Sequence, residues 1–320
     1  MKRIKKPSAF LLLLSLFLFS SCNRSEDAGA HPGPRVAFVL KTLNNPFFID
    51  MQRGAEEAAT RLGINLTVQA AEREVDVEKQ MQIIENLIQT RVEVLLVTPS
   101  GSKEIIPAIA KANQAGIPVI VVDTQVDPEA AREAGIRIAT SIGSDNYEGG
   151  RLAGEYIAQK FNGQAKVAIL EGIPGHETSD SRLRGFLDAV RPTPGIQVIA
   201  SQPANWERDR GFNVFQNILE ANREIDALFA CNDMMALGAM EAIAAAGRTG
   251  KITIVGFDAV EDARIAIRAG TLEASVAQHP DEMGRLAVES AFRVLQGETL
   301  PAVTRVNVEL IQKDDLEPSP

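Results

Sequence analysis

The run Leu43-Asn44-Asn45-Pro46-Phe47-Phe48 places amide groups and two aromatic rings between an apolar segment and a helix-like stretch. The apolar segment, 36–40, is typical of a buried parallel strand, and the stretch 49–62 has helical periodicity and ends at Gly63. Open parallel sheets bind ligands at the carboxyl ends of their strands, where this run would lie. Amides offer hydrogen-bond donors and acceptors, and phenyl rings offer flat apolar faces. The run therefore suits a ligand with hydroxyls on its rim and C–H groups on its faces, which describes a sugar. The alternative is that both rings begin an amphipathic helix and pack inward.

Polar residues recur where later predicted strands end. They are Thr98, Asp123, Asn146, Asn232, Asp233, Asp258 and Gln278. A single Asp or Asn in such a place is most often a helix N-cap. Several amides and carboxylates at one edge of two sheets fit a hydroxyl-rich ligand, because carboxylates accept from paired hydroxyls while amides or arginine donate.

Strand and helix signals alternate along the chain, which predicts an α/β fold of two doubly wound parallel-sheet domains joined by a multi-strand hinge. The apolar runs expected as strands are 64–70, 92–97, 118–122, 136–142, 166–170, 196–200, 227–230 and 252–257. The helical patterns are 75–89, 102–115, 147–161, 181–190, 208–220 and 234–246. Gly116 and Gly247 fit left-handed helix ends. About 285 residues of globular composition also favour two domains.

The first 21 residues have the pattern of an export signal, with a basic head and an apolar run at 9–19 that is too short for a comfortable membrane span. The run ends Phe19-Ser20-Ser21-Cys22, which resembles a bacterial lipoprotein signal in which Cys22 becomes the lipidated first residue, although Phe19 replaces the usual Leu. An ordinary secretory signal cleaved nearby is the alternative. Residues 23–34 are rich in Ser, Gly, Pro and charge and are expected to form a tether.

Composition excludes several classes of function. The signal carries four of the positive charges, so the net charge changes from −9 to −13 on its removal, and an acidic chain argues against nucleic-acid binding. If Cys22 carries lipid, Cys231 has no disulfide partner. The histidines His31, His176 and His279 are scattered, so no metal site and no cofactor are expected.

Taken together, these motifs resemble the ribose-binding protein family, periplasmic sugar-binding proteins of ABC importers with a type I periplasmic-binding-protein fold. The resemblance runs from about Val36 to Lys313. It includes Ser144-Asp145-Asn146, Ser201-Gln202-Pro203-Ala204, Met235-Ala236-Leu237-Gly238-Ala239 and Val255-Gly256-Phe257-Asp258. It implies that ligand is contacted by Asn45, Phe47, Phe48, Thr98, Asp123, Thr124, Asn146, Arg182, Trp206, Asn232, Asp258 and Gln278.

Three residues depart from the family's pattern. Ribose binders typically have Asp-Arg where this chain has Asp123-Thr124, Asn where Thr98 stands, and Phe where Trp206 stands. The missing arginine would leave Asp123 and Asp258 balanced mainly by Arg182. Trp206 is expected to be a wider stacking plate, and the alternative for it is a rim residue that packs on a neighbouring loop. These departures argue against ribose itself as the ligand, while a related monosaccharide is still expected.

The resemblance implies an exported, monomeric binding protein, not an enzyme, that delivers a monosaccharide to an ABC permease. The signal pattern adds the expectation that the protein is anchored to the membrane only through lipidated Cys22. Its expected parts are a signal peptide at 1–21, a tether at 22–34, one lobe at 35–143 plus 279–307, a second lobe at 144–278 plus 308–313, and a tail at 314–320.

The alternatives belong to other classes. A nucleotide-dependent enzyme would need a glycine-rich phosphate loop after the first strand, and a nucleophilic enzyme would need a residue paired with histidine. A transcriptional regulator would need a DNA-binding head where this chain has a signal sequence. A sensor subunit that hands the liganded form to a membrane kinase or chemoreceptor would have the same sequence features as a transport protein.

Overall fold

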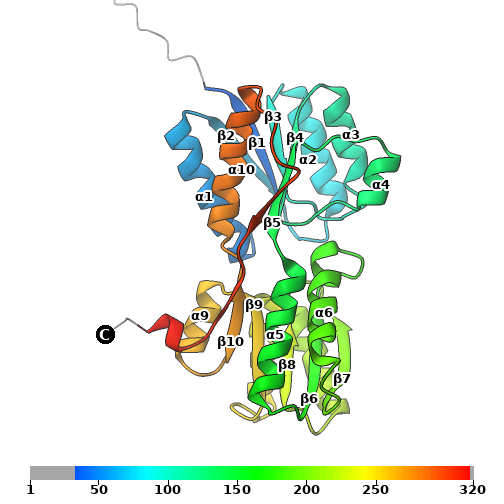
Figure 1. Cartoon of the computed structure of the whole chain (residues 1–320), viewed down its shortest axis with the longest axis vertical. Helices are drawn as coiled ribbons and strands as arrows, with labels where there is room; N and C mark the ends of the chain where they lie inside the picture. Colours follow the sequence, from blue (N-terminus) through cyan, green and yellow to red (C-terminus); the bar gives the residue numbers. More distant parts are fainter. Residues whose placement is uncertain (1–32, 318–320) are drawn as a thin grey trace, which may run out of the picture. The chain divides into compact units, whose positions relative to one another are not determined.

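The computed structural model describes residues 33–317, which form two six-stranded sheets with helices on both faces (Figure 1). Cys22, the signal and nearly all of the tether lie outside the described residues. The strands of the first sheet are β1 Arg35–Thr42, β2 Asn65–Ala71, β3 Val94–Val97, β4 Val119–Val122, β5 Thr140–Ser144 and β11 Val303–Val306. Those of the second are β6 Ala165–Glu171, β7 Ile196–Pro203, β8 Ala227–Ala230, β9 Thr253–Asp258, β10 Ala274–Ala277 and β12 Glu309–Ile311.

The strand orders are β11-β5-β4-β3-β1-β2 and β12-β10-β9-β8-β6-β7. All pairs are parallel except β10 with β12, which is antiparallel. The two sheets therefore repeat one doubly wound arrangement, which confirms the predicted fold class. Each sheet with its helices is called a lobe below, the first lobe containing β1 and the second β6.

Ten helices of the described part cover these sheets: α1 Pro46–Leu62, α2 Val77–Gln89, α3 Ile106–Gln114, α4 Pro128–Glu133, α5 Asn146–Lys160, α6 Glu177–Val190, α7 Arg208–Ala221, α8 Asp233–Ala245, α9 Glu261–Arg268 and α10 Pro280–Leu295. In the first lobe, Phe38 and Leu40 of β1 pack among buried residues of α1 and α10, while the alternate residues Ala37 and Val39 pack among those of α2 and α3. This period-two alternation buries both faces of the strand. None of the helices in this part of the chain is long and apolar enough to cross a membrane.

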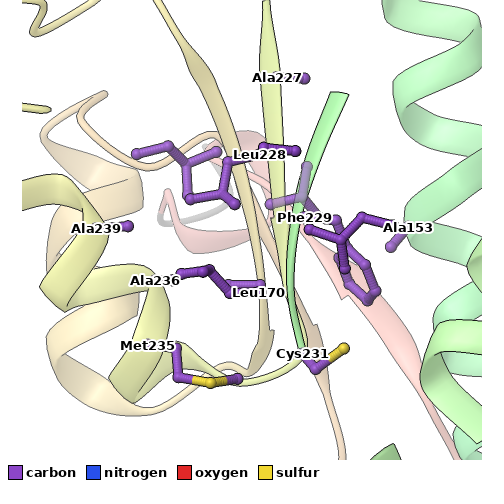
Figure 2. Close-up of a cluster of buried hydrophobic side chains, with 14 of the residues drawn as sticks. Ala153, Leu170, Ala227, Leu228, Phe229, Cys231, Met235, Ala236 and Ala239 are labelled. Atoms are coloured by element: carbon purple, nitrogen blue, oxygen red, sulfur yellow. The ribbon is translucent and has the colours of Figure 1, made fainter. Parts of the chain in front are cut away.

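The second lobe has one continuous core, part of which is shown in Figure 2. The Phe186 and Phe229 rings stack at 4.7 Å across the contact between α6 and β8. Helices α5 and α6 touch through glycines: a Cβ on Gly150 would lie 2.0 Å from the carbonyl oxygen of Arg182, and one on Gly185 would lie 2.0 Å from that of Tyr147. Glycine at both positions lets α6 approach closely, which fixes the place of Arg182.

The chain passes between the lobes three times, after β5, after β10, and between β11 and β12 (Figure 1). Two of these crossings touch, because the Ser144 hydroxyl donates to the carbonyl oxygen of Gln278 at 3.4 Å. The segment that joins β10 to α10 bends sharply at His279, whose φ is +55°. The predicted multi-strand hinge is thus present.

Several element boundaries differ from the sequence prediction. The strand expected at 136–142 begins only at Thr140. Ile136 N–H bonds back to the carbonyl oxygen of Ala131 in α4, and the Asn113 side chain holds the backbone of Arg137. The helix expected from residue 102 begins at Ile106. Helices α4, α9 and α10 and strands β11 and β12 were not predicted individually. Gly116 and Gly247 have φ of +76° and +65°, which confirms the left-handed helix ends.

Candidate ligand-binding site

A cavity of about 260 Å³ lies where the two lobes meet. Its lining is Lys41, Asn45, Phe47, Phe48, Glu74, Asp123, Thr178, Arg182, Trp206, Asn232, Asp258 and Gln278. All of them are buried. Nine of the twelve predicted site residues line it, and Lys41, Glu74 and Thr178 were missed.

Phe47 and Phe48 lie in the first turn of α1, which Asn45 caps by accepting from Phe47 N–H through Oδ1 at 3.1 Å. Their rings meet edge to face with centroids 5.2 Å apart. Both rings are nearly inaccessible and both line the cavity. The core and ligand interpretations of this pair therefore do not exclude each other: the rings are part of the lobe's packing and also the apolar wall of the cavity.

Lys41, the penultimate residue of β1, supplies a cation that the sequence prediction missed. Its Nζ lies 3.1 Å from Asp123 Oδ2 and donates to Thr124 Oγ1 at 2.6 Å. The Thr124 hydroxyl in turn donates to Asp123 Oδ2 at 3.1 Å, which closes a triangle of hydrogen bonds. The expectation that Arg182 mainly balances both aspartates was therefore wrong: Lys41 balances Asp123. Threonine at position 124 provides the hydroxyl that helps to hold the ammonium.

Glu74 is the second missed residue, and it follows β2 in a loop. Asn45 Nδ2 donates to Glu74 Oε1 at 3.1 Å, so the predicted amide both caps α1 and holds this carboxyl. Burial raises the pKa of Glu74, and the Lys41 ammonium and the Asn45 hydrogen bond act against that shift. The raised pKa favours the neutral acid, which can donate a hydrogen bond from its hydroxyl.

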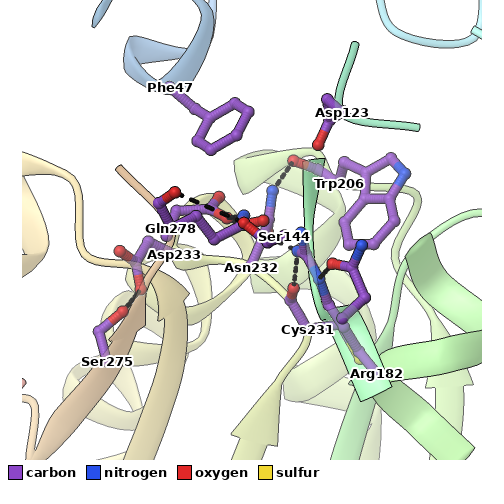
Figure 3. Close-up of polar contacts among 12 residues, drawn as sticks. Phe47, Asp123, Ser144, Arg182, Trp206, Cys231, Asn232, Asp233, Ser275 and Gln278 are labelled. Atoms are coloured by element: carbon purple, nitrogen blue, oxygen red, sulfur yellow. Dashed lines mark hydrogen bonds and ion pairs between the residues drawn. The ribbon is translucent and has the colours of Figure 1, made fainter. Parts of the chain in front are cut away.

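Arg182, on α6, is the cation of the second lobe, and Figure 3 shows its contacts. Its Nε donates to Asn146 Oδ1 at 2.8 Å and its Nη1 donates to the carbonyl oxygen of Cys231 at 2.6 Å. The guanidinium carbon lies 3.8 Å from the centroid of the Phe257 ring. Three protein groups therefore fix the guanidinium before any ligand is bound.

Asp258 ends β9 and faces that guanidinium, with Oδ1 at 3.6 Å from Arg182 Nη1. Gln278 Nε2, from the hinge, donates to the same oxygen at 2.6 Å. Burial raises the pKa of the Asp258 carboxyl, while the positive charge of Arg182 favours its ionised form. Asp258 thus joins the second lobe to the hinge at the edge of the cavity.

Trp206 precedes α7 and lines the cavity with 5% of its surface exposed, so the rim alternative for this residue does not hold. Its carbonyl oxygen accepts from Asn232 Nδ2 at 3.2 Å, and Asn232 Oδ1 caps α8 by accepting from Met235 N–H. The indole lies directly over Gly172, where a Cβ would be 2.0 Å from the ring. The glycine therefore leaves the space that the indole fills.

Left-handed backbone at residues other than glycine gathers around this site. Asp123, Trp206 and Asp258 have φ of +65°, +70° and +113°. Such conformations are strained for residues with a Cβ and concentrate at functional sites, where the surrounding structure holds them. At Asp123 the backbone N–H is held by the carbonyl oxygen of Ile142 at 2.8 Å. All three residues with this backbone conformation line the cavity.

Three predicted site residues are not part of the lining. Thr98 is completely buried, and its hydroxyl donates to the carbonyl oxygen of Val39 at 3.3 Å, so it joins β3 to β1. Thr124 holds Lys41, and Asn146 holds Arg182, as described above. Thr124 and Asn146 therefore do not line the cavity, but each holds a residue that does.

Unpartnered polar atoms point to a polar ligand. Thr178 Oγ1, Trp206 Nε1 and Gln278 Oε1 are buried atoms of lining residues, and none has a hydrogen-bond partner among residues 33–317. Buried polar atoms without partners are costly, so their presence in one cavity favours a ligand with donors and acceptors. By contrast, no group of three His, Cys, Asp or Glu side chains in the described part of the chain could hold a metal ion.

Cys231 lies under the site, fully buried in the second-lobe core. Burial raises the pKa of its thiol to about 12. The thiol is therefore protonated in the folded protein and should react only after unfolding.

A groove of about 860 Å³ adjoins the cavity and shares Asn45, Glu74 and Trp206 with its lining. An ion pair crosses this groove between the lobes: Arg73 donates to Glu207 Oε1 through Nε at 3.0 Å and Nη2 at 2.7 Å. Arg73 precedes Glu74 and Glu207 follows Trp206. The pair therefore joins the backbone segments that carry two lining residues from opposite lobes.

A family model described as "Periplasmic binding protein domain" matches residues 36–299. The chain belongs to the periplasmic binding protein family. The ribose import binding protein of Escherichia coli K12 is 39% identical over 287 residues, which cover 90% of this chain and 93% of that protein. The protein of the same name from Bacillus subtilis 168 is 37% identical and covers 92% of this chain and 94% of its own length.

Solved structures agree with this assignment. A solute binding protein of an ABC transporter from Actinobacillus succinogenes 130z, with bound D-allose, is 38% identical with a TM-score of 0.83, and the match covers 88% of this chain and 99% of that one. The Caulobacter myo-inositol binding protein is 30% identical with a TM-score of 0.82, covering 90% and 95%. The type I periplasmic-binding-protein fold and the predicted resemblance to ribose-binding proteins are thereby confirmed.

Proposed function

We propose that this chain is an exported solute-binding lipoprotein that captures a monosaccharide between its two lobes and delivers it to an ABC importer. The observation that carries the proposal is the buried cavity, in which aromatic faces from both lobes surround carboxylates, amides and two cations. Flat apolar faces match the C–H groups of a sugar ring and the polar atoms match its hydroxyls. The relatives named as binding proteins for ribose and for D-ribose and D-allose support the same ligand class.

The charges of the cavity favour an uncharged ligand. Lys41 is paired with Asp123 and Arg182 faces Asp258, while burial favours neutral Glu74. Neither cation is left over to neutralise a carboxylate or phosphate on the ligand. A sugar acid or sugar phosphate would therefore bring an unpaired charge into a buried site, which is costly.

The proposed mechanism is a clamp. The site residues come from both lobes, so a ligand that satisfies both faces stabilises the closed form over an open one and shifts the population toward it. An importer permease would then recognise the closed form. The proposed lobes are 35–143 plus 279–307 and 144–278 plus 308–313, and the proposed binding form is a monomer.

Membrane attachment through Cys22 rests on the sequence pattern at 19–22. Replacing Cys22 with Ser should release the protein from the membrane fraction of the producing cell. Unchanged membrane association together with cleavage at another site would contradict lipidation.

A sensor role is the second candidate, and one observation favours it. The fructose binding periplasmic domain of a hybrid two component system shares the fold, with 25% identity and a TM-score of 0.82. Genes for a permease and an ATPase beside this one would support import, and a histidine kinase gene would support sensing.

A thermal-shift screen tests the ligand class. The panel is D-ribose, D-allose, D-fructose, D-glucose and myo-inositol, with D-gluconate as the charged comparison. A specific ligand at 100 times its dissociation constant should add about 2.7 kcal/mol to the free energy of unfolding. Stabilisation by one or two neutral members that is lost in Asp258→Ala is the expected result. No stabilisation by any member, or equal stabilisation of Asp258→Ala, would overturn the proposal.

A further inference from the structure

Asp233 is a buried carboxylate that the site described above does not use. It is the first residue of α8, it is completely inaccessible, and it does not line the cavity. A carboxyl group is costly to bury unless hydrogen bonds satisfy it. The hydrogen-bond partners of Asp233 therefore indicate what it does in the fold.

Those partners belong to β10 and to the turn that follows β9. Asp233 Oδ1 accepts from the Ser275 hydroxyl at 2.7 Å (Figure 3), and Oδ2 accepts from Val260 N–H at 2.9 Å. The Ser275 oxygen in turn accepts from Ala259 N–H at 3.0 Å. One buried pair of side chains, Asp233 and Ser275, thus holds the two backbone N–H groups that come directly after Asp258.

The turn held by this pair is strained. Asp258 and Ala259 have φ of +113° and +51°. Two consecutive residues with a Cβ in this region are unfavourable, and such backbone persists only where the surrounding structure holds it. The hydrogen bonds from Val260 N–H and Ala259 N–H are therefore part of what keeps this conformation.

A glycine of β9 leaves the space for the pair. A Cβ on Gly256 would lie 2.1 Å from Asp233 Oδ1 and 3.4 Å from Ser275 Oγ. Because 2.1 Å is well inside van der Waals contact, a larger residue at position 256 would displace the Asp233 carboxylate. The strand that ends at Asp258 thus also leaves room for the group that holds its turn.

We propose that Asp233 is a positioning residue of the ligand site: with Ser275 it holds the turn after β9 so that the Asp258 carboxylate stays directed at Arg182 and the cavity. The inference rests on the proposed function. Asp258 Oδ1 lies 3.6 Å from Arg182 Nη1 and accepts from Gln278 Nε2 at 2.6 Å. A relaxed turn would move this carboxylate away from both partners and weaken the part of the site that the second lobe shares with the hinge.

A general structural role would be that Asp233 only stabilises the second lobe. Both roles predict a lower free energy of unfolding when Asp233 is removed, because Val260 N–H and the Ser275 hydroxyl would lose a buried partner. The two roles differ in how the affinity for the sugar depends on Asp258. A positioning effect disappears once the Asp258 side chain is absent, whereas an independent effect adds to that loss.

The experiment is a double-mutant cycle measured by calorimetric titration with the panel sugar that binds wild type most tightly. Asp233→Ala and Ser275→Ala are each made in the wild-type protein and in Asp258→Ala, and every variant is checked by thermal unfolding.

Two further variants separate positioning from loss of charge and loss of stability. Asp233→Asn is the conservative variant, because its amide oxygen can accept from Val260 N–H while its NH₂ group donates to Ser275 Oγ. Leu272→Ala is the matched control, because this buried core residue precedes β10, at the end of that strand opposite to the cavity.

We expect Asp233→Ala to weaken binding by about 10- to 100-fold. Ser275→Ala should weaken it by about 3- to 10-fold, since the bond from Val260 N–H to Asp233 remains. In Asp258→Ala, either substitution should weaken binding by no more than about two-fold. Asp233→Asn should bind within a few-fold of wild type, and Leu272→Ala should lower the melting temperature without changing the affinity.

Wild-type affinity in both Asp233→Ala and Ser275→Ala would overturn the positioning role, and so would an equal loss in the wild-type and Asp258→Ala backgrounds. Binding in Asp233→Asn as weak as in Asp233→Ala would assign the effect to charge and would overturn it as well. If Asp233→Ala does not fold, Ser275→Ala decides by the same cycle. If wild type binds no sugar of the panel, the proposed function is overturned, whereas a wild type that binds and a cycle without coupling overturn only this inference.

Discussion

The two faces of the cavity each carry one cation beside an aspartate, but they hold it differently. On the second-lobe face, Arg182 is fixed by Asn146, by the carbonyl oxygen of Cys231 and by the ring of Phe257. On the first-lobe face, Lys41 stands at the end of a flexible stem and is held by Asp123 and Thr124. Two of the three groups that hold Arg182 belong to core strands or their ends, whereas both groups that hold Lys41 are side chains of the loop after β4.

This difference indicates that the cation of the second lobe is held more rigidly than the cation of the first lobe. A guanidinium already fixed by its own lobe needs little further ordering when ligand binds, which favours affinity. The Lys41 ammonium is held by two side chains of one loop, so its surroundings can be changed without rebuilding the core. Substitutions on the two faces of the cavity test this difference.

Removing Asp258 should cause the largest loss of affinity. Asp258→Ala takes away the carboxylate between Arg182 and Gln278 and leaves a buried guanidinium without its counter-charge, which we expect to cost about 2–5 kcal/mol of binding free energy. Calorimetric titration with the best panel sugar measures it. The exposed Asp262→Ala is the control, and equal affinity in Asp258→Ala and wild type would remove the second-lobe face from the binding site.

The aromatic wall should give the next largest effect. Trp206→Ala should lose about 1–3 kcal/mol through lost apolar contact, while Trp206→Phe keeps most of the affinity because a flat ring remains. Gly172→Ala should weaken binding without altering any lining side chain, since its Cβ would displace the indole into the cavity. If the affinity is unchanged in both Trp206→Ala and Gly172→Ala, the Trp206 ring does not contribute to ligand binding.

The pH dependence of stability should reveal the buried histidine at the start of α6. His176 is 7% exposed, and burial together with the charge of Lys41 lowers its pKa from 6.5 to about 4. Between these values the unfolded chain binds more protons, so the free energy of unfolding should fall as the pH drops from about 6.5 toward 4. The fall should be smaller in His176→Asn.

Denaturant unfolding of both proteins at pH 7 and pH 4.5 measures this difference. Glu74 shifts in the opposite direction, because its raised pKa favours the folded protein at low pH. The comparison between His176→Asn and wild type cancels that contribution. The same loss of stability in both proteins would show that His176 is protonated without penalty.

The ion pair at the groove should have the smallest effect. Arg73 and Glu207 are partly exposed, so their bond is weak and screened by salt. Arg73→Gln should speed ligand release by a few-fold at low salt and by less at 0.5 M salt. Stopped-flow release rates at two salt concentrations measure this, with Arg268→Gln as a control for a surface pair within one lobe. Release rates that are unchanged at low salt would remove the pair from any role in holding the lobes together.

The sequence predicted the second-lobe side of the cavity better than the first-lobe side, for a physical reason. Asn232, Asp258 and Gln278 lie at or just after the ends of predicted strands, and the topology of parallel sheets brings such residues to one edge. Trp206 lies beyond the strand predicted at 196–200 and was expected at the site from the family resemblance. Lys41 was missed because it belongs to the same strand as the apolar run 36–40. A lysine in such a strand is expected to point to solvent. Glu74 was missed because it lies in a loop whose path depends on packing against Asn45.

The helix and strand boundaries show the same limit. The strand expected from residue 136 starts later because Arg137 and Ile136 are held by neighbours that the local pattern does not show. Likewise, Thr98 was expected at the site from its place after a predicted strand and from the resemblance, and Thr124 from the resemblance alone, yet both hydroxyls donate to protein groups. Local sequence gives the type of side chain at a strand end, whereas its direction is set by contacts distant in the chain.

If the cavity between the lobes holds an uncharged monosaccharide, the intrinsic emission of Trp206 should respond to its binding. Trp206 is the only tryptophan in the chain and lines the cavity, so the indole reports on this site without an added probe. Titration with the panel sugars should shift or change the emission saturably for a neutral sugar and leave it unchanged for D-gluconate, and Asp258→Ala should abolish the response. A sugar that binds by calorimetry without changing the emission of Trp206 would contradict binding in this cavity.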